Sequence, residues 1–175
     1  QRFLHTSPEY AMKRLLAAGS GDIWQLCKVF RADERSALHN PEFTMLEWYR
    51  VGFDMTALIS EVTDLVQAML NIAGAPARPA QRITYREAFL EHVGVDPFVS
   101  DRAALEAAAA PAALPDATLR STSRDELLDL LMALRVGPRL GPGALTFITH
   151  YPASPAALAR LDPADPRVAH RFELY

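Results

Sequence analysis

The feature that most constrains this chain is a pair of β-rich runs on either side of a polar stretch. Residues 23–30 (IWQLCKVF) make the first run, residues 42–49 (EFTMLEWY) make the second, and residues 31–41 between them are mainly polar or charged. Two such runs around a polar connection predict an antiparallel hairpin with a long loop. We therefore take this hairpin as the element around which the other elements are arranged.

Alternation along the strands predicts which side chains of the hairpin share a face. On the second strand one face carries Phe43, Met45, Glu47 and Tyr49. Antiparallel pairing brings Arg31, just after the first strand, close to the start of the second. One face of the hairpin then carries a guanidinium, an aromatic ring, a carboxylate and a phenol.

These groups together favour a site for a nucleotide and an amine. Arginine binds phosphate through planar, bidentate hydrogen bonds, and an aromatic ring such as Phe43 stacks on a nucleobase. Glu47 and Tyr49 can hold an ammonium group. Each residue taken alone is typical of a solvated strand face, so the functional interpretation rests on the joint pattern.

The same residues carry a resemblance to a known family. Phe30 and Arg31, the acidic pair that follows, and residues 39–49 (HNPEFTMLEWY) resemble motif 2 of the class II aminoacyl-tRNA synthetases, and the lysine branch most. Residues 6–10 (TSPEY) and 13–16 (KRLL) resemble the lysyl-tRNA synthetase paralogues that attach a lysine-type amino acid to elongation factor P. The resemblance continues through residues 146–154 (TFITHYPAS) and 167–175 (RVAHRFELY).

The resemblance implies an α+β fold, with an antiparallel sheet flanked by helices. Residues 1–175 would form a partial class II catalytic domain with a helical insertion at about 76–140. We find neither motif 1 nor motif 3 in the sequence. We therefore expect a fragment of a ligase, with weak ATP affinity and negligible turnover on its own.

The resemblance also assigns roles around ATP. Arg31 would be the catalytic residue, holding the α-phosphate and the amino-acid carboxylate. His39 and Asn40 would lie over the triphosphate and the adenine edge, and Phe43 would stack on adenine. The family motif usually has Glu two residues after its arginine. Here Asp33 stands at that position and is followed by Glu34, and which of the two takes the acidic role stays open.

The amino-acid site would be formed by Ser7, Glu9, Glu47 and Tyr49. The carboxylate of Glu9 would face the α-amino group of the substrate, and Glu47 with Tyr49 would contact the lysine side chain or its amino groups. Without the resemblance, Glu9 is explained by its place in the first turn of a helix, where the dipole favours a negative charge.

The activity implied is the activation of lysine or β-lysine as an aminoacyl-adenylate, with ATP and Mg²⁺, and its transfer to a lysine of elongation factor P. One alternative is the catalytic core of a lysyl-tRNA synthetase that charges tRNA. Another is a non-catalytic synthetase-like module that binds an amino acid, a nucleotide or a partner protein. Class II cores usually pair through motif 1, so a homodimer of the full-length protein is one alternative and the oligomeric state stays open.

Composition narrows these alternatives. Half of the 175 residues are hydrophobic and 22% are charged, which is typical of one soluble globular domain. The net charge of −3 gives no support to a basic surface that binds nucleic acid. The single cysteine, Cys27, excludes an internal disulfide, and no apolar run is long enough to cross a bilayer. We expect a cytoplasmic protein with no metal-binding cluster.

Local signals predict the remaining elements. Ser7 is expected to cap a helix that begins at Pro8, and a helix from Met55 is expected to cover the back of the sheet that carries the hairpin. Residues 71–82 are predicted to be a connection. Helices are expected after Thr84, Asp101 and Ser123, the first and last with Glu at the third helical position, and strands at 145–151 and 168–175.

Overall fold

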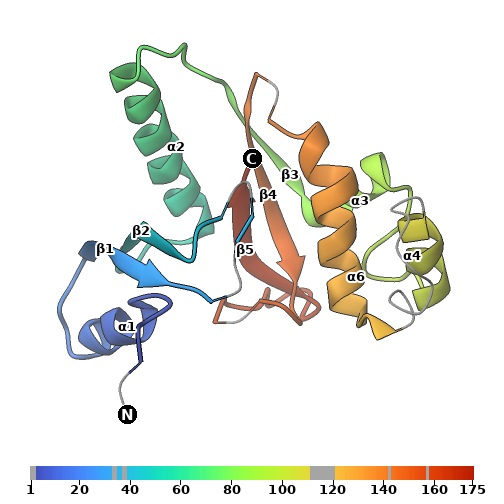
Figure 1. Cartoon of the computed structure of the whole chain (residues 1–175), viewed down its shortest axis with the longest axis horizontal. Coiled ribbons are helices and arrows are strands. Elements are labelled where there is room, and N and C mark those ends of the chain that lie inside the picture. Colours follow the sequence, from blue (N-terminus) through green and yellow to red (C-terminus); the bar gives the residue numbers. More distant parts are fainter. Residues whose placement is uncertain (1–2, 33–34, 37–38, 111–120, 142, 157) are drawn as a thin grey trace. The chain divides into compact units, whose positions relative to one another are not determined.

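The chain has an α+β fold that divides into two compact units, Gln1–Asp54 and Met55–Tyr175 (Figure 1). The computed structural model describes residues 3–32, 35–36, 39–110, 121–141, 143–156 and 158–175. The α+β prediction is confirmed. The predicted division into a catalytic domain with an insertion at about 76–140 stays a prediction.

The described part of the first unit contains helix α1 (Glu9–Ala17) and the predicted hairpin of β1 (Ile23–Phe30) and β2 (Glu42–Tyr49). The strands pair in antiparallel register, with Val29 opposite Phe43 and Gln25 opposite Glu47. On β2 the face of Phe43 and Glu47 is half-buried, whereas Glu42, Thr44 and Leu46 on the other face are exposed. The alternation expected from the sequence is therefore present.

The second unit contains a three-stranded sheet in the order β3 (Ala80–Thr84), β4 (Leu145–Pro152) and β5 (Val168–Leu174). β5 runs antiparallel to β4, but β3 runs parallel to it, so this sheet is mixed rather than antiparallel throughout. The prediction of a connection at 71–82 was wrong at both ends, because α2 ends at Ile72 and β3 begins at Ala80. β3 has only five residues, and its pairing partner lies more than 60 residues later in the chain.

Helix α2 (Met55–Ile72) covers one face of β4 and β5 (Figure 1). Its buried Ile59 packs with Leu145 and Phe147 of β4. The apolar stripe of this helix had been expected to cover the sheet that carries the hairpin. Its packing partners are instead strands of its own unit.

The other face of this sheet carries the larger core, under α3 (Tyr85–His92), α4 (Arg102–Ala109) and α6 (Arg124–Leu131). Thr84 and Ser123 form the two predicted capping boxes, and Asp101 caps α4. After α6 the chain continues as a π-helix, η2 (Met132–Val136), and a 3₁₀ turn, η3 (Gly137–Arg139). Among the described residues, no helix has both the length and the hydropathy needed to span a membrane.

The capping box at the start of α3 gives a test of this unit. Thr84 accepts the backbone N–H of Glu87, and the Glu87 carboxylate accepts the backbone N–H of Thr84 in return. We expect Thr84→Ala to lower the free energy of unfolding by about 1 kcal/mol, measured by urea denaturation. The control Ser60→Ala, exposed on α2, should change it by less than about 0.5 kcal/mol. Equal effects of the two substitutions would contradict the capping assignment.

Candidate active site

Arg31 and Phe43 lie on the same side of the hairpin, as the strand alternation predicted. The guanidinium carbon of Arg31 is 5.4 Å from the centre of the Phe43 ring. The backbone N–H of Arg31 donates to Pro41 O at 2.8 Å, which closes the ladder at the start of the loop. A cation and an aromatic face are thus adjacent, an arrangement that suits a phosphate beside a nucleobase.

The Arg31 side chain is held by the segment before α1. Its Nε donates to Thr6 O at 3.2 Å. That segment is fixed along β1, because Phe30 N donates to His5 O at 3.0 Å and the His5 ring bonds Lys28 O at 2.7 Å. Sequence reasoning missed this support, since backbone carbonyls leave no signal in residue types.

Glu47 lies at the centre of a second group of contacts on the same face. Ser7 Oγ donates to Glu47 Oε2 at 2.7 Å, and Tyr49 OH donates to Oε1 at 2.6 Å. Each carboxylate oxygen has two lone pairs, so each can still accept from a ligand. Glu47 is therefore fixed in orientation while remaining available to an ammonium group.

Ser7 joins the start of α1 to β2. Its hydroxyl hydrogen goes to Glu47, and its oxygen accepts the backbone N–H of Glu9 at 3.0 Å. The N-cap residue is Pro8, one residue later than predicted, and its side chain makes no capping bond. The Ser7 hydroxyl still accepts an N–H of the first turn of α1, and it also contributes to the site.

Glu9 lies in the first turn of α1, as predicted, and forms an ion pair with Lys13 at 2.8 Å. Both side chains are more than a third exposed, and ion pairs of this kind contribute little. An ammonium group of a ligand can therefore compete with Lys13 for Glu9.

Tyr49 remains protonated in this environment. Burial, its hydrogen bond to Glu47 and the negative charges of Glu47 and Glu9 raise the pKa of Tyr49 well above its usual value. The neutral phenol is thus a fixed donor to Glu47, and Glu47 and Glu9 are the anionic groups that an amine would meet.

The predicted site residues in the loop between β1 and β2 lie outside this group of contacts. His39 and Asn40 are exposed, and Nδ1 of His39 bonds Ser36 Oγ at 2.8 Å. In the described part of the loop, no hydrogen bond joins His39 or Asn40 to Phe43. Asp33 and Glu34 lie outside the described residues, so their predicted roles stay predictions.

The spacing along β2 suits an elongated ligand. Phe43 and Glu47 are four residues apart on one strand face, which corresponds to about 13 Å. The Thr6 contact draws the Arg31 side chain toward the segment that also carries Ser7. A ligand on this face would meet an aromatic ring at one end, a guanidinium beside it and a carboxylate at the other end.

The sequence profile of the tRNA synthetases class II (D, K and N) matches residues 1–175. The chain belongs to this family. Among curated proteins it is similar to elongation factor P-(R)-beta-lysine ligases, with 49% identity to that of Klebsiella pneumoniae and 50% to those of Erwinia tasmaniensis and Pseudoalteromonas translucida. These matches cover 99% of this chain and 52% of each relative, so the chain spans about half the length of those proteins.

Membership of the class II synthetase family implies the use of ATP. The described residues fit this, because a guanidinium beside a half-buried aromatic ring is a combination suited to a nucleotide. Within the described ranges, no three His, Cys, Asp or Glu side chains gather in a way that could hold a metal ion.

The pKa of Tyr49 offers a test of the contacts in this candidate site. In Glu47→Gln, the hydrogen-bonded negative charge is lost, so the neutral phenol is favoured less and the pKa of Tyr49 should fall toward its ordinary value. The measurement is an ultraviolet titration of tyrosinate, with Tyr49→Phe subtracted. Glu42→Gln, on the opposite face of β2, should leave the titration unchanged. A Tyr49 pKa that is unchanged by Glu47→Gln would contradict the hydrogen bond between Tyr49 and Glu47.

Proposed function

We propose that the protein containing this chain is an ATP-dependent ligase that activates β-lysine or lysine and transfers it to a lysine of elongation factor P. The observation that carries the proposal is the shared face of the hairpin, on which Arg31 lies against Phe43 and Glu47 is held by Ser7 and Tyr49. The names of the relatives favour (R)-β-lysine as the amino acid.

In the first step, a carboxylate oxygen of the amino acid attacks the α-phosphorus of ATP. A carbon-oxygen-phosphorus link forms, and pyrophosphate leaves. Because the amino-acid carboxylate and the α-phosphate are both anions, the protein contributes mainly by positioning them and by supplying positive charge. Arg31 is the residue that supplies both, because its guanidinium is fixed by Thr6 O beside the ring on which adenine would stack.

The amine of the substrate would be held at the other end of the face. Glu47 presents a carboxylate whose direction is set by Ser7 and Tyr49. Glu9 provides a second negative charge near Tyr49. These two carboxylates suit a substrate with two amino groups, as lysine and β-lysine have.

In the second step, the ε-amino group of a lysine on the acceptor attacks the carbonyl carbon of the adenylate. An amide bond forms, AMP leaves, and the amine loses a proton. A protein acceptor is favoured over tRNA by the names of the relatives, and the net charge of −3 agrees with it. A requirement for Mg²⁺, a homodimer and a cytoplasmic location are part of the same proposal.

An acceptor assay tests the proposal directly. The natural-length protein is incubated with ATP and labelled β-lysine or lysine, in the presence of elongation factor P or tRNA. We expect ATP-dependent label on elongation factor P, with β-lysine preferred, and background label on tRNA. Label on tRNA alone would favour the lysyl-tRNA synthetase alternative, and label on neither would favour a non-catalytic module.

A pyrophosphate-exchange assay of the natural-length protein with Arg31→Lys tests the proposed catalytic residue. Lysine keeps the charge but cannot form the planar, bidentate contact. We expect kcat/KM for pyrophosphate exchange to fall on the order of 100-fold, the usual cost of losing one preorganised donor. Arg14→Lys, an exposed change in the last turn of α1, is the matched control. Equal activity of the two variants would overturn the role of Arg31.

A further inference from the structure

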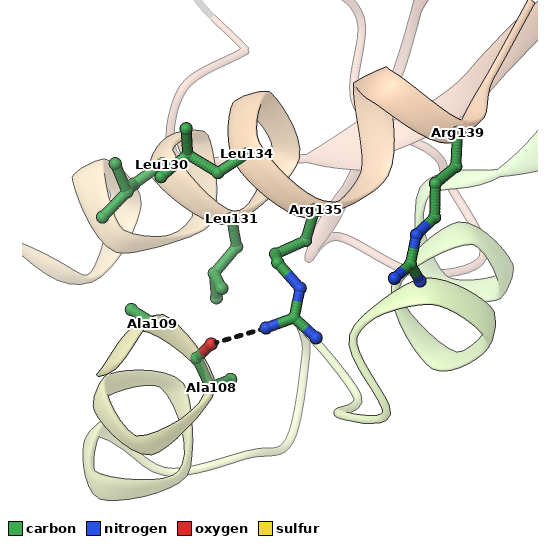
Figure 2. Close-up of a pocket in the computed structure, with 7 residues that line it drawn as sticks. All are labelled: Ala108, Ala109, Leu130, Leu131, Leu134, Arg135 and Arg139. Atoms are coloured by element: carbon green, nitrogen blue, oxygen red, sulfur yellow. Dashed lines mark hydrogen bonds between the residues drawn. The ribbon is translucent and has the colours of Figure 1, made fainter. Parts of the chain in front are cut away.

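The second unit contains a cavity of about 490 Å³ between α4 and the segment from α6 to η3 (Figure 2). Its apolar wall is formed by Leu130, Leu131, Leu134, Ala108 and Ala109. Among the described residues, the α4 side of the cavity is lined by these two alanines, whose side chains are short. The volume lies in the range typical of small-molecule sites.

Two arginines, Arg135 and Arg139, complete the lining of this cavity. Figure 2 shows both side chains extending from the same side of the helical segment. Arg135 Nη1 donates to Ala108 O at 3.3 Å, and Arg139 Nη1 donates to His92 O at 3.1 Å. A guanidinium has five N–H donors, so both retain donors for a ligand.

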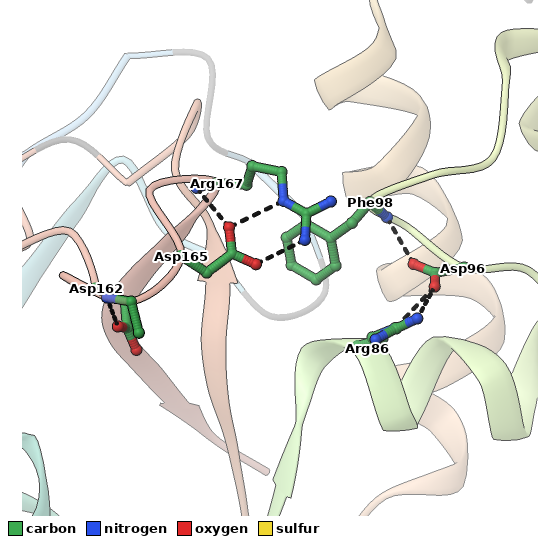
Figure 3. Close-up of polar contacts among 7 residues, drawn as sticks. Arg86, Asp96, Phe98, Asp162, Asp165 and Arg167 are labelled. Carbon is green, nitrogen blue, oxygen red and sulfur yellow. Dashed lines mark hydrogen bonds and ion pairs between the residues drawn. The ribbon is translucent and has the colours of Figure 1, made fainter.

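Neither arginine is neutralised in the described part of the chain. Their partners there are backbone carbonyls, and no described carboxylate lies within ion-pair distance of either guanidinium. By contrast, Figure 3 shows Arg86 paired with Asp96, and Arg167 paired with Asp165, elsewhere in the same unit. Among the described residues, the cavity therefore combines an apolar wall with two arginines whose printed partners are backbone carbonyls.

The backbone at this cavity is also unusual. Arg135 and Leu134 belong to the π-helix η2, and the buried Leu131 is the residue immediately before it. π-Helical turns are rare and occur frequently at functional sites. The neighbouring Leu134 is 49% exposed although it lines an apolar wall. The π-helical backbone and the exposed Leu134 are independent of the charges, and both lie at this cavity.

We propose that this cavity binds a small amphipathic anion, a carboxylate or phosphate ester with an apolar chain. The anionic head would accept hydrogen bonds from Arg135 and Arg139, which are suited to planar oxyanions. The chain would lie among Leu130, Leu131 and Leu134, removing apolar surface from water. All of these residues belong to the second unit, so the proposal does not depend on the function proposed for the hairpin.

Isothermal titration calorimetry of the full chain with four probes tests this site. Decanoate and decyl phosphate carry both halves of the expected ligand, decanol lacks the charge, and inorganic phosphate lacks the chain. We expect saturable one-to-one binding of decanoate or decyl phosphate, and the stronger of the two identifies the head group. Decanol and phosphate should bind at least about tenfold more weakly, since a charged hydrogen bond or a buried chain contributes more than 1.4 kcal/mol.

Variants of the two cavity arginines test whether decanoate binds in this cavity. The exposed Arg139 can be replaced alone, and Arg139→Gln should weaken decanoate binding. The double variant, Arg135→Gln with Arg139→Gln, should weaken it further, at least about tenfold in total. Arg160→Gln, exposed and outside the cavity, should bind like the unmodified chain. Absence of saturable binding by either charged probe, equal binding of decanol, or equal affinity of the Arg139→Gln and Arg160→Gln variants would overturn the proposal.

Discussion

The hydrogen bond from Ser7 to Glu47 is the contact on which the candidate site depends. It spans 40 residues of sequence and ties the segment before α1 to the middle of β2. The same segment holds Arg31 through Thr6 O, and it is itself fixed to β1 through His5. The positions of the guanidinium and of the carboxylate are therefore set by three consecutive residues, so a shift of this segment would displace both ends of the site.

This arrangement fixes the ligand groups before a ligand arrives. Glu47 is half-buried, and both of its oxygens accept from protein donors. Because the raised pKa of Tyr49 keeps its hydroxyl protonated, the orientation of Glu47 does not depend on the substrate. Preorganised charges of this kind need little rearrangement when charge develops in a reaction. In the proposed reaction two anions are joined, with Arg31 as the cation on this face and Glu47, together with Glu9 of α1, as the anionic groups for an amine.

Strand alternation and capping signals in the sequence correctly predicted part of the fold and of the candidate site. The period of two placed Arg31 and Phe43 on one face, and the capping boxes at Thr84 and Ser123 located two helices. Features that depend on distant backbone groups were missed. The Thr6 carbonyl has no residue-type signature, and β3 is a strand only because β4 pairs with it. The π-helix at η2 could not be distinguished from an α-helix by its leucine pattern.

We propose that a single ligand, with a base at one end and an amine at the other, binds along one face of the hairpin. A crystal structure of the natural-length protein with a non-hydrolysable β-lysyl-adenylate analogue would test this binding mode. We expect an adenine ring stacked on Phe43, oxygens of the phosphate mimic on Arg31, and an amino group within hydrogen-bond distance of Glu47. An analogue bound elsewhere, or with its amino groups away from Glu47, would contradict it.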